Sequence, residues 1–228
     1  MKSGLSTFYF LLITFHLFFV KITYQPIEEK HAREVAKLLR LCFPQMPPGD
    51  QFTAKELREL AQIFPEGTII ALDGDRVVGM GTGIFTDIDL DNLPPSEDEL
   101  LYALDGRNLH DWNGRYYFGS DMAVHPDYRG RRIGRAIYDR RKAVIQKYNK
   151  EGFVAAAVLP GYGQHEATLD IHTYLAKVVA GELFDPTLSM QIRNGFQVIR
   201  PIKDFFVYPR SSNWCALILW ANPDYEKS

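Results

Sequence analysis

The sequence predicts a mixed α/β fold in which helices pack on a twisted sheet. Residues 68–72 and 76–85 are two apolar runs joined by Asp73-Gly74-Asp75, which is a hairpin signal. Further along, an apolar strand over 115–124 is followed by a helical pattern and then by the continuous apolar run 153–159. Such a run is typical of a central strand covered on both faces, and the three segments form a strand–helix–strand unit.

The other elements of the first half follow in order. We expect a first strand over 20–26 and an amphipathic helix over 28–42, whose apolar side chains recur at helical spacing. Thr53-Ala54-Lys55-Glu56 is a capping box, which predicts a second helix ending at Ile63. Residues 87–113 form a long polar connection rich in Asp, Glu and Pro. We interpret its acidic part as a solvated loop or as a patch that steers a cationic amine.

The second half alternates helices and strands in the same way. Apolar spacing predicts one helix over about 133–149 and another over about 167–179. Asp185-Pro186 opens a short helix that ends at the C-cap Asn194-Gly195. The last strands are expected over 196–199 and 216–220.

Composition and charge exclude several classes of protein. The 228 residues are 46% hydrophobic and 24% charged, which is ordinary for a globular protein able to bury a core without disulfides or metals. The net charge of −2 gives no global nucleic-acid footprint. Cys42 and Cys215 lie among apolar neighbours, which favours two buried thiols in a reducing compartment. No residues have the spacing of metal ligands, so we expect no metal site.

The N-terminus carries an apolar segment over 8–20, interrupted only by Thr14 and His16. It is shorter than the ~20 residues that span a bilayer and nearer to the apolar region of a signal peptide. We expect residues 1–19 to be a mis-assigned start or a dispensable extension, and residues 20–228 to be a single cytoplasmic domain. A weak membrane anchor with a cytoplasmic body and a secretory signal are the alternatives.

The most informative segment runs from Met122 to Ala136. It contains a strand end, a proline stop, a short basic turn and a helix start. Gly130 and Gly134 let the backbone approach a ligand closely, and the free N–H groups of the turn and first helical turn carry partial positive charge. Full charges are added by Arg129, Arg131, Arg132 and Arg135. This arrangement is typical of a phosphate or pyrophosphate site.

The same segment resembles the acetyl-CoA signature of the GCN5-related N-acetyltransferases (GNAT), Arg/Gln-x-x-Gly-x-Gly/Ala preceded by Val-x-Pro-x-Tyr-Arg-Gly. Arg132 stands where the signature has its middle glycine. The resemblance covers residues 20–221 and implies the GNAT acyl-CoA N-acyltransferase fold, a mixed sheet of about seven strands flanked by helices. The matching positions are Val124, Pro126, Tyr128, Arg129, Gly130 and Gly134.

The resemblance also implies acetyl-CoA as co-substrate, held by the turn and by the strand before it. The later basic residues Arg140, Arg141 and Lys142 are interpreted as a solvated helix face. More narrowly, the segment from Asp185-Pro186 to Asn194-Gly195-Phe196 resembles acetyltransferase modules joined to nitrilase-type amidohydrolases. The cofactor-binding residues so implied are Met122, Ala123, Val124, Arg129, Gly130, Arg131, Arg132, Ile133, Gly134 and Arg135.

Acyl transfer to an amine needs a base for the ammonium and can use an acid for the departing thiolate. Asp121 lies at the end of an apolar strand, where burial would raise its pKa and suit it to proton abstraction, directly or through water. Many relatives have a Tyr four residues before the Gly-Phe that ends their last helix, and here that position is Gln191. Tyr162 and His165, in the turn after the central strand, are the candidate replacements for this acid.

These residues together predict an acetyl-CoA-dependent N-acetyltransferase that acts on a primary amine of a small molecule or peptide. The alternative is a degenerate CoA-binding sensor or scaffold without turnover. Arg132 in place of glycine and Gln191 in place of tyrosine favour this alternative. A nucleic-acid partner is not expected, because the arginines are confined to one helix start and no aromatic stacking surface accompanies them. We expect a monomer or homodimer, with any membrane contact confined to residues 8–20.

Overall fold

The structure is a computed structural model that describes residues 21–47, 49, 51–102 and 110–227. The predictions for residues 1–19 and for the apolar segment 8–20 lie outside these described residues. In the part of the chain that the structure describes, no helix has the length and apolar character needed to cross a bilayer.

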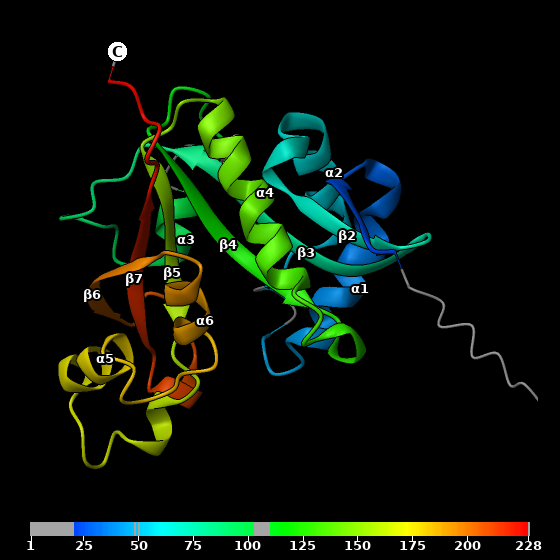
Figure 1. Ribbon diagram of the computed structural model, residues 1–228. Coiled ribbons are helices and arrows are strands. Elements are labelled where there is room, and N and C mark those ends of the chain that lie inside the picture. Colours follow the sequence, from blue (N-terminus) through cyan, green and yellow to red (C-terminus); the bar gives the residue numbers. More distant parts are fainter. Residues whose placement is uncertain (1–20, 48, 50, 103–109, 228) are drawn as a thin grey trace, which may run out of the picture.

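A mixed seven-stranded sheet, as the family resemblance implied, forms the centre of the molecule (Figure 1). Its strand order is β1-β2-β3-β4-β5-β7-β6. All neighbouring strands are antiparallel except β4 and β5, which are parallel. The strands are β1 (Thr23–Pro26), β2 (Ile69–Asp73), β3 (Arg76–Thr86), β4 (Tyr116–Val124), β5 (Gly152–Val158), β6 (Gln197–Lys203) and β7 (Trp214–Ala221).

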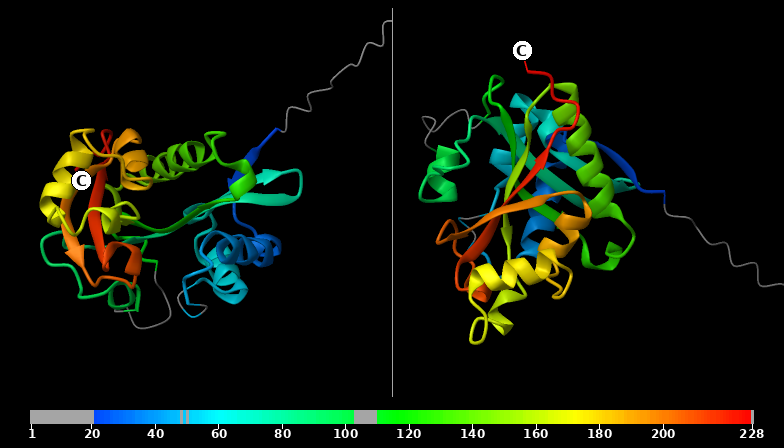
Figure 2. Two further views of the ribbon diagram at one scale, coloured as in Figure 1. Left: turned by 90° about the horizontal axis from the view of Figure 1, so that it is seen from below. Right: turned by 60° about the vertical axis from the view of Figure 1, so that its left-hand side comes forward.

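Helices cover both faces of this sheet (Figure 2). In the first half, α1 and α2 pack on one face of β2 to β4, and α4 packs on the opposite face. In the second half, α5 and α6 share a core with α4, β5 and β7, while α3 packs on the other side of β5 and β7. The helices are α1 (Ala32–Cys42), α2 (Ala54–Ile63), α3 (Glu97–Tyr102), α4 (Ile133–Lys147), α5 (Ile171–Val179) and α6 (Leu188–Arg193).

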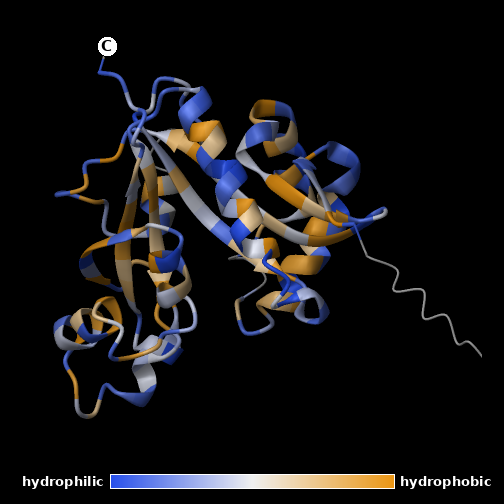
Figure 3. Cartoon of the chain, viewed as in Figure 1, coloured by the Kyte–Doolittle hydropathy of each residue, from blue (hydrophilic) through white to orange (hydrophobic). Residues whose placement is uncertain are grey.

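Local signals account for several element ends. Thr53 accepts a hydrogen bond from the Glu56 backbone, and the Glu56 side chain accepts one from the Thr53 backbone, so the predicted capping box begins α2. Gly195 has a φ of +84°, which ends α6 at the predicted C-cap. The apolar residues gather along the strands and the inward faces of the helices, as Figure 3 shows.

Some predictions of the secondary structure were wrong. The helix predicted from Ala167 begins at Ile171, because the carboxylate of Asp170 accepts hydrogen bonds from the backbone of His172 and Thr173 and caps the helix there. The polar connection over 87–113, for which no helix was predicted, contains α3.

The parallel pair β4–β5 is joined over only three residue pairs, from Tyr116↔Gly152 to Phe118↔Val154. Beyond Phe118 the two strands diverge, as Figure 1 shows. On its other edge, β4 carries a β-bulge at the same level, where Ser120 and Asp121 together oppose Thr82 of β3. Asp121 therefore lies in the bulge, on the part of β4 that no longer pairs with β5.

Candidate functional site

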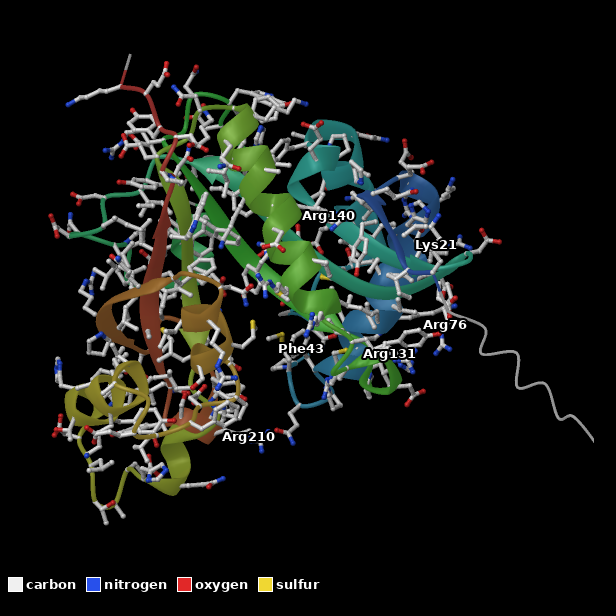
Figure 4. The ribbon with its side chains drawn as sticks, viewed as in Figure 1. Lys21, Phe43, Arg76, Arg131, Arg140 and Arg210 are labelled. Carbon is white, nitrogen blue, oxygen red and sulfur yellow. The ribbon has the colours of Figure 1, made fainter. Side chains whose placement is uncertain are left out.

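A cleft of about 1520 Å³ lies where β4 and β5 diverge. Phe43, which follows α1, and Arg210, in the 3-10 turn before β7, are among its lining residues and are labelled in Figure 4. The floor is lined by β4 over 119–124, by β5 over 155–158, by the basic turn and by side chains of α4 and α6. The cleft thus joins the predicted phosphate turn to the predicted catalytic strand.

The basic turn is held in shape by Tyr128 and by two residues with positive φ. The Tyr128 side chain is buried and its hydroxyl donates a 2.5 Å hydrogen bond to Asp73 of the β2–β3 hairpin. Gly130 has a φ of +75°, and no atom lies within 4 Å of where a Cβ would stand. The backbone at Gly130 is therefore open to a ligand, directly before the free N–H groups of α4.

Arg132, the departure from the GNAT signature, keeps the backbone shape of the glycine it replaces. Its φ is +62° and it is the N-cap of α4. A residue with a Cβ adopts this left-handed conformation at a cost of about 1–2 kcal/mol. The substitution therefore changes the side chain and the local strain rather than the path of the turn.

Nine of the ten predicted cofactor-binding residues line the cleft; the exception is Arg131. The guanidinium of Arg131 lies 4.9 Å from the ring centroid of Tyr128, and it donates to the carbonyl of Asp127. Arg76 approaches the same ring, and both arginines are labelled at this outer side of the turn in Figure 4. Arg131 therefore braces the turn from outside the cleft.

Asp121 lines the cleft and is partly buried. Burial raises the pKa of its carboxyl to about 6, although the positive charge of Arg141 acts in the opposite direction. No hydrogen bond to this carboxyl occurs within the described residues. Asp121 is therefore a carboxylate free to exchange a proton near neutral pH.

The prediction of a solvated helix face is wrong for Arg141, because this residue is only 2% exposed. It lies between α4 and the sheet and lines the floor of the cleft. Its Nε donates to the Tyr117 hydroxyl at 2.9 Å, and its Nη2 donates at 2.5 Å to the carbonyl of Thr82, at the bulge. The rings of Phe153 and Tyr117 lie 4.4 and 5.0 Å from the guanidinium.

The other two members of that basic run differ from Arg141. Arg140 is exposed and stacks on Tyr24 of β1 at 3.9 Å. Lys142 is partly buried and donates to the carbonyl of Asn194, which ties α4 to the end of α6. Only Arg140 therefore fits the solvated face that the sequence predicted.

Gln191 faces Tyr138 across the cleft floor. The side-chain Nε2 of Gln191 on α6 donates a 3.3 Å hydrogen bond to the hydroxyl of Tyr138 on α4. Both residues are buried and line the cleft, and Gln191 Oε1 has no hydrogen-bond partner in the described part of the chain. Tyr138 thus brings a phenol to the place where many relatives have one from the other helix.

The two predicted acids are placed differently. Tyr162 is buried, does not line the cleft and donates its hydroxyl proton to the carbonyl of Leu169 at 3.3 Å. His165 lines the cleft and lies beside Tyr174, with ring centroids 5.6 Å apart and the rings tilted by 37°. The geometry therefore does not support Tyr162 as an acid, whereas His165 stays at the edge of the site.

Sequence reasoning missed Tyr138 and Arg141, although their spacing carried a signal. Gly134, Tyr138 and Arg141 are separated by four and three residues, so all three lie on one face of α4. Since Gly134 belongs to the signature of the turn, this spacing indicates that Tyr138 and Arg141 lie on the same side of α4 as the turn. In the described residues no group of three or more His, Cys, Asp or Glu side chains could hold a metal ion.

Residues 32–161 match the sequence profile of the acetyltransferase (GNAT) family. This match extends over more than half of the chain and includes the basic turn and Asp121. The chain belongs to the GNAT family. The prediction from the signature is confirmed, and with it the GNAT fold and the enzyme class of acyltransferase.

Two curated relatives come from Bacillus subtilis (strain 168). The uncharacterized N-acetyltransferase YkwB is 26% identical over 216 residues, which cover 92% of this chain and 93% of the relative. The probable hydrolase YhcX is 27% identical over 208 residues, or 90% of this chain. The GNAT chain spans only 39% of the length of YhcX.

Solved structures share the fold at low sequence identity. The GNAT-like decarboxylase GphF, in complex with isobutyryl-CoA, has a TM-score of 0.71 at 17% identity, covering 87% of this chain and 98% of its own. The loading domain of CurA from Lyngbya majuscula has the same TM-score at 15% identity, covering 88% and 98%. The protein yncA from Salmonella typhimurium, solved with acetyl-CoA, has a TM-score of 0.56 at 12% identity, covering 90% and 96%.

Proposed function

We propose that this GNAT protein binds acetyl-CoA in the cleft and transfers the acetyl group to a primary amine of a small molecule or peptide. The observation that carries the proposal is the position of Asp121. The divergence of β4 from β5 puts this carboxylate in the same cleft as the basic turn. Asp121 and the turn are joined by the segment of β4 that does not pair with β5. A phosphate-binding end and a proton-accepting end are what acyl transfer from CoA to an amine requires.

The residues of the turn fit the pyrophosphate of CoA. Gly130 leaves its backbone uncovered, and the first N–H groups of α4, which have no partner within the helix, follow it in the chain. A Cβ on Gly134 would meet only the mobile end of the Met122 side chain, at 2.8 Å, and Val124 at 4.0 Å. Exposed Arg129, Arg132 and Arg135 supply positive charge around this backbone.

The edge of β4 that faces the cleft fits the amide-containing arm of CoA. Met122, Ala123 and Val124 follow the last residue that pairs with β5, so their backbone groups on that edge have no strand beside them. An extended ligand with amide groups can add to such an edge as a strand would. Bound there, acetyl-CoA supplies the activated acetyl group at the end of the arm.

Asp121 then acts as the base. A pKa of about 6 leaves the carboxyl mostly ionised at neutral pH and still basic enough to take a proton from an ammonium group. Burial gives Asp121 this property, because it disfavours the charged form more than Arg141 favours it.

Tyr138 takes the role of proton donor to the leaving thiol. Its hydroxyl oxygen accepts from Gln191, and its proton has no acceptor within the described residues. Burial raises the pKa of Tyr138, whereas Arg141 and the Gln191 hydrogen bond lower it. A neutral phenol with a free proton thus lines the cleft, so the absence of a tyrosine at position 191 does not argue against turnover. Arg132 keeps a glycine-like backbone, so its departure from the signature does not argue for a CoA sensor either.

The test combines binding with turnover. Calorimetric titration with acetyl-CoA measures affinity, and thiol release with a panel of primary amines measures transfer. We expect acetyl-CoA binding and amine-dependent CoA release, with acetylated amine detected by mass spectrometry. Binding without release for any amine would support the sensor instead, and absence of binding would overturn both.

A further inference from the structure

Helix α6 is too short to hold its own position. It has 6 residues, well below the ~12–15 at which an isolated helix becomes marginally stable in water. Gln191, whose side chain donates to the Tyr138 hydroxyl, lies on this helix. Their hydrogen bond is 3.3 Å long, slightly longer than the ~2.7–3.2 Å typical of N–H···O bonds. The placement of Gln191 against Tyr138 therefore depends on contacts that fix α6 from outside.

A buried carboxylate fixes the beginning of α6. Asp185 is fully buried, and its Oδ1 accepts hydrogen bonds from the backbone N–H groups of Thr187 and Leu188. Its Oδ2 accepts from the hydroxyl of Tyr174 on α5 and from the backbone of Gly161, which follows β5. These bonds tie the start of the helix to α5 and to the end of β5, and none of them reaches α4.

The ammonium of Lys142, on α4, fixes the other end of α6. Its Nζ donates to the carbonyl of Asn194, the C-cap residue. The last carbonyls of a helix have no partner within it and attract cations. The rings of Trp220 and Phe196 lie 4.9 and 5.6 Å from Nζ and offset part of the cost of its partial burial. Lys142 is therefore held at the helix end by one carbonyl and two aromatic rings.

The contact of Lys142 and the contact of Tyr138 lie one turn apart on the same pair of helices. Tyr138 and Lys142 are four residues apart on α4, so their side chains share a face. Gln191 lies in the last turn of α6, and the backbone N–H of Asn194 donates to its carbonyl at 2.9 Å. A shift of Asn194 away from Lys142 would therefore carry Gln191 away from the phenol.

We propose that Lys142 is a positioning residue for the proton donor, because it holds the end of α6 so that Gln191 stays bound to the Tyr138 hydroxyl. The proposal rests on the proposed function and adds a residue that does not line the cleft. In the transfer, the amine nitrogen bonds to the thioester carbonyl carbon and the carbon–sulfur bond breaks. The amine proton passes to Asp121 and the sulfur takes the proton of Tyr138, while Lys142 keeps its own.

A double-mutant cycle tests this dependence, with saturating acetyl-CoA and a primary amine that the parent acetylates. Lys142→Met should lower kcat about tenfold, the cost of a small misplacement of a reacting group, and leave acetyl-CoA affinity unchanged. In a Tyr138→Phe background the same replacement should lower kcat less than about twofold, because the group that it positions is absent.

Equal losses in the two backgrounds would show that Lys142 is merely structural and would overturn the proposal. A Tyr138→Phe variant as active as the parent would do the same, since Lys142 would then have no proton donor to position. A parent that releases no CoA with any amine would instead overturn the proposed function.

The pH–rate profile gives a second readout. Burial raises the pKa of Tyr138, whereas Arg141 and the hydrogen bond from Gln191 lower it. Loss of that bond in Lys142→Met should therefore move the alkaline limb to higher pH, and a general loss of packing would leave the limb in place. In a Gln191→Met background, where no such bond remains, Lys142→Met should not move the limb. A shift there would be a direct effect of the lost charge and would refute the positioning role.

Two further variants complete the design. Lys142→Arg keeps a cation that can donate to the Asn194 carbonyl, so it should restore both kcat and the alkaline limb, and a folded Lys142→Arg without recovery would count against the proposal. The matched control is Arg140→Met, which removes an exposed cation two residues earlier on α4 and should behave like the parent. If Lys142→Met does not fold, Lys142→Gln, which is polar but one atom shorter, replaces it in both tests.

Discussion

Gln191 on α6 and Tyr138 on α4 are joined by a hydrogen bond of 3.3 Å, in which the amide donates to the phenol oxygen. Gln191 cannot protonate a thiolate, but it positions Tyr138, whose phenol can. Because the bond uses the oxygen of Tyr138 and not its proton, the phenol remains a donor toward the cleft.

Tyr138→Phe should therefore lower kcat by about 10²-fold, within the range of general acid catalysis, and change acetyl-CoA affinity little. The alkaline limb of the pH–rate profile should flatten, because the group that titrates there is removed. Tyr162→Phe is the matched control, since its hydroxyl serves the carbonyl of Leu169 outside the cleft. Equal losses in the two variants would show that neither phenol is the acid.

Asp121→Asn should lower kcat by about 10²–10⁴-fold while acetyl-CoA still binds. The amide keeps the shape of the side chain but cannot take a proton. In the parent enzyme, activity should rise with pH through a pKa of about 6, and this acid limb should vanish in the variant. A pH profile unchanged by the substitution would move the base to water or to another carboxylate.

The same substitution should stabilise the fold in alkaline solution. The pKa of Asp121 is raised from 3.8 to about 6, so the folded state binds the proton more tightly than the unfolded state. The stability that this provides is complete below about pH 4 and is lost as the pH rises through 6. Asp121→Asn should therefore gain about 2–3 kcal/mol over the parent at pH 8 and little at pH 4. Denaturant titrations at both pH values measure this, and a loss at pH 8 would indicate a structural carboxylate.

Gly130→Asp should abolish acetyl-CoA binding, because it places a carboxylate at the proposed pyrophosphate site. The control is Gly74→Asp in the β2–β3 turn, where φ is +56° and space is equally open. Both variants carry the same left-handed strain of about 1–2 kcal/mol, so they should unfold alike and differ only in calorimetric affinity. Gly134→Asp should act like Gly130→Asp, whereas Arg129→Ala should weaken binding by about 1–3 kcal/mol. Normal CoA affinity in both glycine variants would place the pyrophosphate elsewhere.

Arg132→Gly should leave the turn intact, because glycine adopts the φ of +62° freely. We expect a melting temperature equal to or above that of the parent and an acetyl-CoA affinity reduced only by the loss of one charge. Thermal denaturation with and without acetyl-CoA measures both. A large loss of affinity would mean that the Arg132 side chain, and not the backbone of the turn, carries the binding.

Where a structure depends on neighbouring residues, the sequence alone was sufficient. The capping box at Thr53, the hairpin turn at Asp73-Gly74-Asp75 and the C-cap at Gly195 are made by groups within a few residues of one another. The basic turn belongs only partly to this class, because the positive φ of Gly130 and the start of α4 are local, whereas the hydrogen bond from Tyr128 to Asp73 joins segments 55 residues apart. The fold class followed from these signals and from the order of the apolar runs.

Only the tertiary structure could decide which charged and polar residues meet in the cleft. Arg141 has the sequence context of a solvated helix face, and it is buried because Gly81 and Gly119, far away in the chain, leave room for it. Tyr138 and Gln191 are 53 residues apart, and they meet because α4 and α6 pack over the same part of the sheet. Local propensity acts within a few residues, whereas the desolvation of a charge and the pairing of side chains depend on atoms that folding brings together from distant segments.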